Sequence, residues 1–270
     1  MIALNDFYGF ERTPFTKSIA TESLFPSRGH QEVQGRLHFA LQERLPALIT
    51  GDVGTGKSTA LRAFAQSLDR NIYYVVYLSN PHLTVTSLYR QILLALQVEP
   101  AYNFLQLQPQ LQSSLAEFVR KGRYVLLVID EGHLLPSELF NQLRFLLNQE
   151  MDSASLITLV LLGQPELAHK LRFAPYEALY QRIAVRYQIP PFDLEETAGY
   201  VKHHLRVVGF QGSLFSDSFV GSVHDHTKGV ARKINNLCRS ALLLGASERK
   251  QLLDETDLKR VILDLEGRLA

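Results

Sequence analysis

The chain has 270 residues, enough for one large domain and a smaller one, and its 46% hydrophobic and 20% charged content is ordinary for a globular protein. A formal net charge of +1 indicates no overall basic field for nucleic acid or membrane, although a local basic stripe is compatible with DNA binding. The single cysteine, Cys238, excludes an internal disulfide and a cysteine-based zinc cluster.

The N-terminal residues contain no basic region followed by an apolar core, so they do not predict a secretory signal. No apolar run approaches the ~18 residues of a membrane-spanning helix. We therefore expect a cytoplasmic protein with no membrane partner.

The first predicted elements flank a glycine-rich loop. Residues 45–50 form a short apolar run that predicts a strand, and residues 59–68 carry apolar side chains at helical spacing. Between them, Gly51-Asp52-Val53-Gly54-Thr55-Gly56-Lys57-Ser58 matches the phosphate-binding pattern G-x-x-x-x-G-K-[ST] at every required position.

The chemistry of this loop predicts a nucleotide site. Its backbone amides, together with the positive end of the following helix, would face a phosphate group. We expect Lys57 to reach the β- and γ-phosphates and the Ser58 hydroxyl to ligate Mg2+. The expected nucleotide-binding residues run from Gly51 through Thr59.

Further along the chain, apolar runs alternate with helical patterns. Helical spacing marks residues 88–96 and 139–147. The remaining predicted strands are residues 72–78, 124–129, 156–162 and 185–189. Two of these runs are continuously apolar, which indicates burial on both faces, as in a parallel sheet. The alternation predicts a doubly wound α/β sheet.

Pro190-Pro191 ends the alternation, and the rest of the chain is predicted to be helical. Asp193 followed by Glu196 is typical of a helix start, in which one side chain caps the amides near the other. Further helices are expected at residues 216–223, 231–244 and 256–265. We therefore expect a nucleotide-binding domain at residues 1–191 and a helical lid domain at residues 192–270.

The lid sequence also contains paired histidines. Without cysteines or clustered carboxylates nearby, they are expected at the surface rather than as metal ligands. They are His203, His204, His224 and His226.

Acidic and polar residues follow two predicted strands. Asp130 and Glu131 come directly after residues 124–129. Asp130 would hold the hydration shell of Mg2+, and Glu131 would polarise a water aimed at the γ-phosphate. Gln164 follows the strand expected beside the phosphate loop and is placed to bond the γ-phosphate or the attacking water. The alternative for Gln164 is a turn residue before a helix begun by Pro165.

Two arginines are candidates for contacts with phosphate. Arg182, ahead of the last strand, is expected at the edge of the domain, where it would enter a neighbouring subunit's site as an arginine finger. Arg186 is a competing candidate, and a plain surface arginine is the alternative. Arg232 lies in the first turn of a helix, where a cation is electrostatically unfavourable unless an anion is bound. Arg232 is expected to fold over the γ-phosphate, and a solvated cation near the start of a helix is the alternative.

Taken together, these residues resemble an AAA+ ATPase, with the Walker A, Walker B, sensor 1, arginine finger and sensor 2 positions in order. More narrowly, residues 7–15, residues 24–27 with His30, and residues 130–135 and 163–167 resemble the ExeA-like group. The resemblance implies a P-loop AAA+ doubly wound parallel sheet followed by a small all-helical lid. It also implies ATP and Mg2+ as cofactors and ATP hydrolysis to ADP and phosphate. By the same resemblance, the segment around Phe25 and Pro26 would line the adenine pocket.

The ExeA-like group includes secretion-associated ATPases and the helper ATPases of DNA transposons, such as the TniB, TnsC and MuB types. A secretion member is expected to continue into a membrane span and a cell-wall-binding domain, so a chain ending at Ala270 favours a transposition helper. The resemblance implies that such a helper forms a homo-oligomeric ring or helical filament on duplex DNA. It would present that DNA to a transposase and be disassembled by hydrolysis.

In this group the segment after the second strand faces DNA. It is weakly basic here, but phosphate contacts accumulate when subunits repeat along an oligomer. The candidate DNA contacts are Asn80, His82, Thr84, Thr86 and Arg90. For His82 and Thr84 taken singly, an ordinary loop role is the better interpretation. Two other functions remain open: an ATPase of secretion or envelope-complex assembly, and a nucleotide-gated adaptor that hydrolyses weakly.

Overall fold

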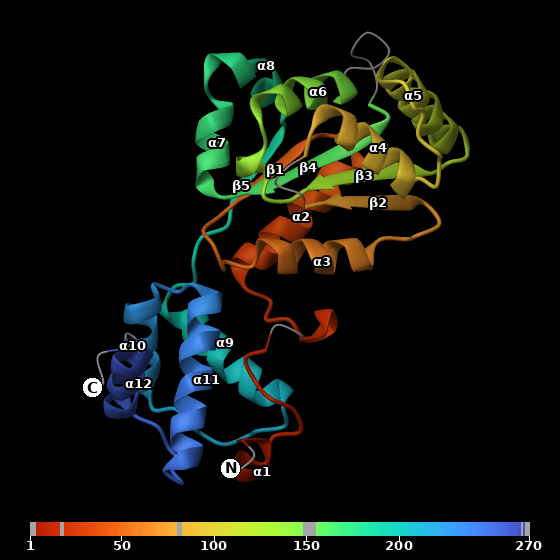
Figure 1. Ribbon diagram of the computed structural model, residues 1–270. Helices are drawn as coiled ribbons and strands as arrows, with labels where there is room; N and C mark the ends of the chain where they lie inside the picture. Colours follow the sequence, from red (N-terminus) through yellow and green to blue (C-terminus); the bar gives the residue numbers. More distant parts are fainter. Residues whose placement is uncertain (1–3, 17–18, 80–82, 148–154, 266, 268–270) are drawn as a thin grey trace. The chain divides into compact units, whose positions relative to one another are not determined.

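The computed structural model describes residues 4–16, 19–79, 83–147, 155–265 and 267 (Figure 1). The chain forms two compact units. The sheet unit comprises Gln31–Gly51 and Lys57–Ile189, and the helical unit comprises Met1–His30, Asp52–Gly56 and Pro190–Ala270. The helical unit thus begins again at Pro190, beside the expected boundary, but it also includes the N-terminal segment that the sequence analysis placed with the nucleotide-binding domain.

The sheet unit is built on five parallel strands, whose order is β2-β3-β4-β1-β5 (Figure 1). The strands are β1 (Ala47–Thr50), β2 (Tyr73–Leu78), β3 (Tyr124–Ile129), β4 (Ile157–Gly163) and β5 (Val185–Gln188). Their register pairs Thr50 with Gly163 and Ile129 with Leu161. The carboxyl ends of β1, β3 and β4 therefore meet at one edge of the sheet. This arrangement confirms the predicted doubly wound parallel sheet, with β4 beside the strand that leads into the phosphate loop.

Helices cover both faces of this sheet. One face packs against α2 (Arg28–Gln42) and α3 (Lys57–Ser67) through side chains that include Leu126 and Val128. The other face, which includes Leu127 and Ile129, is covered by helices that follow β2, β3 and β4. These are α4 (Val85–Ala95), α5 (Phe104–Arg120), α6 (Ser137–Leu147), α7 (Pro165–Leu171) and α8 (Glu177–Arg182). Burial on both sides explains why β3 has an unbroken apolar sequence.

The helical unit contains α9 (Leu194–Val207), α10 (Asp217–Thr227), α11 (Ala231–Ser247), α12 (Glu255–Leu265) and the short α1 (Leu4–Tyr8). The predicted start of α9 is confirmed, because Asp193 Oδ1 accepts the Glu196 amide at 2.8 Å. Tyr8, Phe10 and Phe15 pack into the apolar core of these helices. In the described part of the chain, no helix has the length and apolar character needed to span a bilayer.

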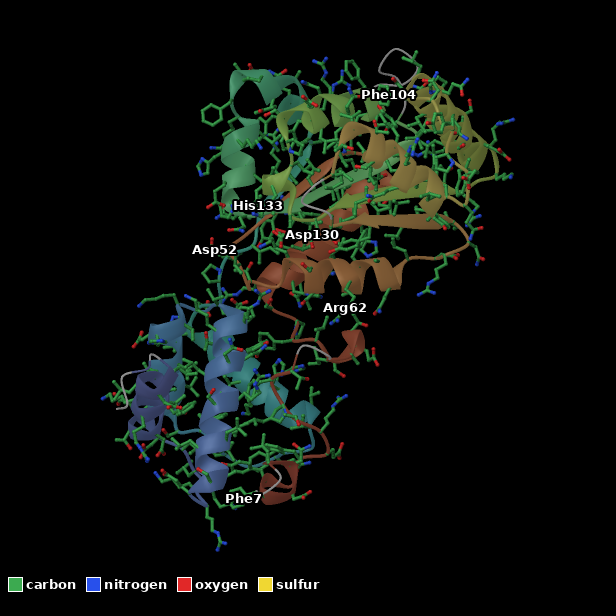
Figure 2. All side chains as sticks on the ribbon, in the orientation of Figure 1. Phe7, Asp52, Arg62, Phe104, Asp130 and His133 are labelled. Atoms are coloured by element: carbon green, nitrogen blue, oxygen red, sulfur yellow. The ribbon has the colours of Figure 1, made fainter. Side chains whose placement is uncertain are left out.

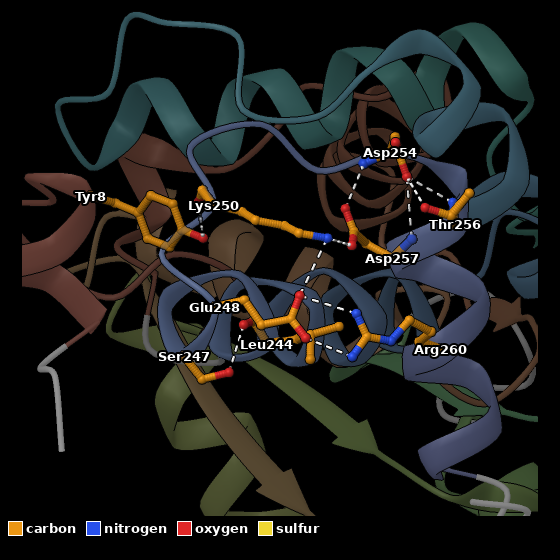
Figure 3. Close-up of polar contacts among 9 residues, drawn as sticks. All are labelled: Tyr8, Leu244, Ser247, Glu248, Lys250, Asp254, Thr256, Asp257 and Arg260. Atoms are coloured by element: carbon orange, nitrogen blue, oxygen red, sulfur yellow. Dashed lines mark hydrogen bonds and ion pairs between the residues drawn. The ribbon is translucent and has the colours of Figure 1, made fainter.

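A polar network also ties the N-terminal segment to the last two helices (Figure 3). The Tyr8 hydroxyl donates to the Lys250 carbonyl at 3.2 Å, and the Lys250 ammonium pairs with the buried Asp257 carboxylate. Glu248 accepts two bonds from the Arg260 guanidinium, at 3.0 and 2.6 Å. Burial, with the nearby Asp257 charge, raises the pKa of Tyr8 to about 12. These contacts, with the apolar ones, place the N-terminal segment in the helical unit.

The prediction that His204 lies at the surface is wrong. Its side chain is buried, and its ring stacks on Phe15 with centroids 5.1 Å apart and lies 4.4 Å from the Tyr200 ring. In α9, His204 shares a face with Tyr200 and Val201, which also belong to the core, because residues three and four apart point the same way. Burial, with a smaller effect from His203, lowers the pKa of His204 to about 4.

This shift predicts acid sensitivity in the helical unit. The pKa of His204 is lower in the folded chain than in the unfolded chain, so its stabilising contribution is complete above about pH 6.5 and is lost as the pH falls toward 4. Between pH 7.5 and 5, protonation of His204 should lower the unfolding free energy of the unmodified chain by about 2 kcal/mol. His204→Phe should not show this part of the decrease. Urea unfolding followed by circular dichroism measures this difference. The exposed His226 supplies the control, because His226→Phe should retain the full loss.

Candidate nucleotide-binding site

The phosphate loop connects β1 to α3, as the sequence predicts. In the sheet unit, Gly51 follows β1 and Lys57 begins α3. The Lys57 ammonium donates to the Gly51 carbonyl at 2.6 Å, and the Lys57 side chain is buried. Ser58, the second residue of α3, is exposed. The lysine is therefore held at the end of β1, against the backbone of its own loop.

The middle of the loop, Asp52–Gly56, packs in the helical unit. Thr55 donates its hydroxyl to the Asp52 carbonyl at 2.9 Å, which closes a tight turn. Gly54 has a φ of +92°, a backbone conformation that residues other than glycine rarely adopt. The Arg232 amide, at the start of α11, donates to the Gly54 carbonyl at 3.1 Å. The start of α11 thus contacts the loop through its backbone, while the Arg232 side chain is exposed.

The Asp130 carboxylate, in the sheet unit, accepts hydrogen bonds from several groups. One of its oxygens, Oδ2, accepts the Ser58 hydroxyl at 3.0 Å and the Tyr77 hydroxyl at 2.7 Å. Its other oxygen accepts the Glu131 amide at 2.8 Å. The carboxylate is buried at the end of β3 (Figure 2). Burial and the bond to Asp130 raise the pKa of Tyr77, so its hydroxyl stays protonated and continues to donate.

The residues present fit a magnesium ion carried with a nucleotide. Mg2+ prefers oxygen ligands and is usually held by one or two protein groups together with phosphate oxygens and waters. The Ser58 hydroxyl and the Asp130 carboxylate supply two such oxygens only 3.0 Å apart.

Glu131 has an unusual backbone conformation. Its φ is 53° and its ψ is 34°, in the left-handed region, which costs energy for a residue with a side chain. Strain of this kind concentrates at functional sites. The Glu131 carboxylate is half exposed, with a side-chain relative accessibility of 49%. A carboxylate in this position is accessible to solvent and to a ligand.

Gln164 follows β4 and precedes α7, but its side chain does not cap that helix. Instead its amide Nε2 lies 2.9 Å from His133 Nε2. His133 belongs to the single turn of 3-10 helix η2 (Gly132–Leu134) that follows Glu131. The Gln164 side chain therefore contacts a histidine from the neighbouring strand's loop and does not cap the helix that follows it.

The two competing arginines have different surroundings. Arg186, in β5, donates to the carbonyls of Ile183 and Tyr180, both at 2.8 Å, and its guanidinium lies 3.9 Å from the centre of the Tyr180 ring. Arg182 is the last residue of α8 and is partly buried. The Arg186 guanidinium is therefore held by its own chain.

Phe25, predicted to line an adenine pocket, lies in the helical unit. Its ring meets those of Tyr200 and Phe192 edge-on, at 5.7 and 6.0 Å, and the adjacent Pro26 is exposed.

The structure describes only part of the segment predicted to face DNA. Thr84 accepts the Ser87 amide at 3.2 Å in a capping box and so begins α4. Thr84 thus has a structural role as the N-cap of α4. Arg90 donates to the Tyr102 carbonyl at 3.1 Å, and Thr86 is partly buried. The other two predicted contacts, Asn80 and His82, lie outside the described residues.

Sequence reasoning missed Tyr77 and His133 as site residues. Tyr77 lies next to the end of β2, the strand that pairs with β3, so its position in a strand neighbouring Asp130 was the only available signal. His133 lies three residues after Asp130, and its contact with Gln164 depends on the packing of two loops.

Tyr77→Phe should lower the affinity of the nucleotide-bound chain for Mg2+ by about tenfold. The reason is the loss of a hydrogen bond that orients Asp130, the expected Mg2+ ligand. Titration of a fluorescent ATP analogue at increasing Mg2+ concentration measures this effect. Tyr73→Phe, at the other end of β2, is the matched control. Identical Mg2+ titrations for Tyr77→Phe and the unmodified chain would contradict the prediction.

Comparisons with known proteins agree with this geometry. Residues 40–171 match the AAA domain family. General secretion pathway protein A of Aeromonas hydrophila is 31% identical over 265 residues, covering 97% of this chain, and the chain spans about half (48%) of that relative's length.

Two solved structures share the fold. Cdc6p of Pyrobaculum aerophilum has a TM-score of 0.70 at 18% identity and covers 93% of this chain and 70% of its own. The Aeropyrum pernix ORC1 protein, solved in complex with DNA, has a TM-score of 0.64 at 19% identity, covering 93% of this chain and 68% of its own. Residues 40–171 thus match the AAA domain family, and nearly the whole chain is similar in sequence to part of general secretion pathway protein A.

Proposed function

We propose that this protein binds ATP with Mg2+ and hydrolyses it to ADP and phosphate. The observation that carries the proposal is the set of bonds on Asp130, which joins the first turn of α3 to the ends of β2 and β3. In addition, a strained, half-exposed Glu131 follows Asp130 directly. A site that only stores nucleotide would need the hydrogen bonds on Asp130, but it would not need a strained, half-exposed Glu131.

Each residue has a proposed task. Lys57 leaves the Gly51 carbonyl and binds the β- and γ-phosphates, while the loop amides of residues 51–59 surround them. When bound, Mg2+ neutralises charge on the phosphates. Ser58 and Asp130 hold the metal, and Glu131 accepts a proton from the attacking water. Gln164 orients that water or the γ-phosphate.

Three further roles follow from the resemblance to AAA+ ATPases. Arg182 acts on the phosphate bound by a neighbouring subunit, which requires a homo-oligomer, either a ring or a helical filament. Arg232 senses the γ-phosphate. Phe25 and Pro26 contact the adenine.

Lys57→Ala should abolish tight ATP binding, and Glu131→Gln should retain it while lowering hydrolysis by at least about 100-fold, because only the proton acceptor is lost. Fluorescent-nucleotide binding and phosphate release measure the two effects. Lys202→Ala and Glu138→Gln, both at exposed positions, are the controls. If Glu131→Gln hydrolysed ATP at the unmodified rate, the chain would instead be a weakly hydrolysing, nucleotide-gated adaptor.

For the partner, we propose duplex DNA and a transposase, with the protein acting in the cytoplasm as an ATP-dependent regulator of transposition. Support comes from the resemblance to transposition helpers and from a fold shared with an ORC1 protein that was solved with DNA. The second candidate is an ATPase of secretion or envelope-complex assembly. The 31% identity to general secretion pathway protein A favours this alternative specifically.

DNA dependence separates these candidates. A transposition regulator should form rings or filaments visible by negative-stain microscopy only when a slowly hydrolysed ATP analogue and duplex DNA are both present. Assembly should weaken with added salt, because phosphate contacts accumulate over subunits. If only monomers form with both ligands, the transposition role fails. ATP-driven assembly that ignores DNA would favour the secretion role.

Arg182→Ala should bind nucleotide normally but lose about 1000-fold in hydrolysis, as expected for an arginine finger. A mixture of Arg182→Ala and Lys57→Ala subunits should be more active than either alone, because each supplies what the other lacks. Arg239→Ala, at an exposed position, is the control. A mixture no more active than its components would contradict a role in the neighbouring site.

A further inference from the structure

Two glycines bring the loop after β3 against the tip of β4. A Cβ on Gly163 would lie 2.7 Å from a Leu167 methyl carbon and 3.3 Å from the His133 amide nitrogen. A Cβ on Gly132 would lie 3.0 Å from the same methyl carbon and 3.1 Å from the Leu162 carbonyl oxygen. Neither position has room for a side chain without displacement. This close approach places the His133 ring beside the first residue after β4.

His133 is thereby positioned between two residues of the proposed catalytic site. Its Nε2 lies 2.9 Å from the side-chain nitrogen of Gln164. Its Nδ1 lies 3.5 Å from Glu131 Oε2 and accepts the Gln164 backbone amide, also at 3.5 Å. The ring is largely shielded from solvent, with a side-chain relative accessibility of 14%. One imidazole thus connects the residues that follow two adjacent strands.

The groups around the ring suit a positioning role. The Gln164 backbone amide donates to His133 Nδ1, and the Gln164 side-chain amide lies against Nε2. One ring thus holds both the backbone and the side chain of Gln164, with the Glu131 carboxylate 3.5 Å from Nδ1. A water between the Gln164 side chain and Glu131 would be oriented by both, and Glu131 would accept its proton.

We propose that His133 is a positioning residue that links Gln164 and Glu131 in one relay, so that both side chains orient the attacking water. The inference rests on the proposed ATPase function. Disruption of the relay should lower the rate of the chemical step and leave nucleotide binding intact, because none of its three members is expected to contribute most of the affinity for phosphate.

The kinetic test compares His133→Phe with His133→Gln. The phenyl ring preserves the packing but forms no hydrogen bond, and we expect kcat to fall by about 10- to 100-fold with KM within twofold. Glutamine both donates and accepts, so His133→Gln should recover much of the loss. His169→Phe, an exposed position on α7, is the control, and thermal unfolding checks that each variant folds. An unchanged kcat in His133→Phe would overturn the proposal.

A double-mutant cycle tests whether His133 acts through Gln164. If it does, His133→Phe in a Gln164→Ala background should cause little further loss, because the two residues work as a unit. Losses that multiply would mean that His133 acts independently, and the relay would be rejected.

A spectroscopic readout separates this proposal from the ATPase proposal. Imidazole nitrogen signals of the full chain, labelled with 15N-histidine, should change for His133 in Gln164→Ala and in Glu131→Gln, with the His133 signals identified by their loss in His133→Phe. Unchanged signals would overturn the relay. If the unmodified chain hydrolyses ATP no faster than Lys57→Ala, the ATPase proposal fails, and the imidazole signals alone decide whether the relay exists.

Discussion

The parallel register of β3, β4 and β1 is the constraint on which the rest of the sheet unit depends. Because Thr50 pairs with Gly163 and Ile129 with Leu161, three strands end at nearly the same level of one edge. The residues that directly follow β3 and β4 are polar, Asp130 and Gln164, and they therefore lie at that edge. Hydrogen bonds from Ser58 and Tyr77 can converge on Asp130 only because β2 and α3 also end or begin there. A slip of one residue would turn these side chains to the opposite face.

The helical unit is organised differently, because its contacts join residues far apart in sequence. Tyr8 reaches the Lys250 carbonyl across 242 positions, and Phe15 stacks on His204. The N-terminal segment supplies aromatic side chains to a core that the C-terminal helices alone would leave incomplete. The helical unit is therefore built from both ends of the described chain.

Local patterns predicted most of the sheet unit. The strand at residues 124–129 matched β3 in full, and the start of α9 was identified from Asp193 and Glu196. The sequence did not predict α5, because Pro109 lies inside that helix and its residues include several glutamines. The capping residue Asn103 was the available signal, since its side chain accepts the Leu105 amide.

Site residues were predictable where a motif carries them and unpredictable where two loops create them. The phosphate loop and Asp130 follow from sequence alone, whereas the contacts of Tyr77 and His133 arise between neighbouring strands. The contacts of Tyr8, Phe10 and Phe15 with the helices likewise join parts of the chain far apart in sequence. His204 was misjudged because a polar residue type was given more weight than its place on the apolar face of α9.

The close approach of α11 to the phosphate loop has a consequence for loop exchange between ATPases. The general pattern leaves the fourth position of the loop open to any residue. In this chain that position is Gly54, where a Cβ would come within 2.6 Å of the Arg232 Cβ and 3.2 Å of a Val230 methyl group. Glycine is thus required there by the start of α11, independently of any phosphate. A loop transplanted from a homologue with a bulkier residue at this point would satisfy the motif and still push α11 away.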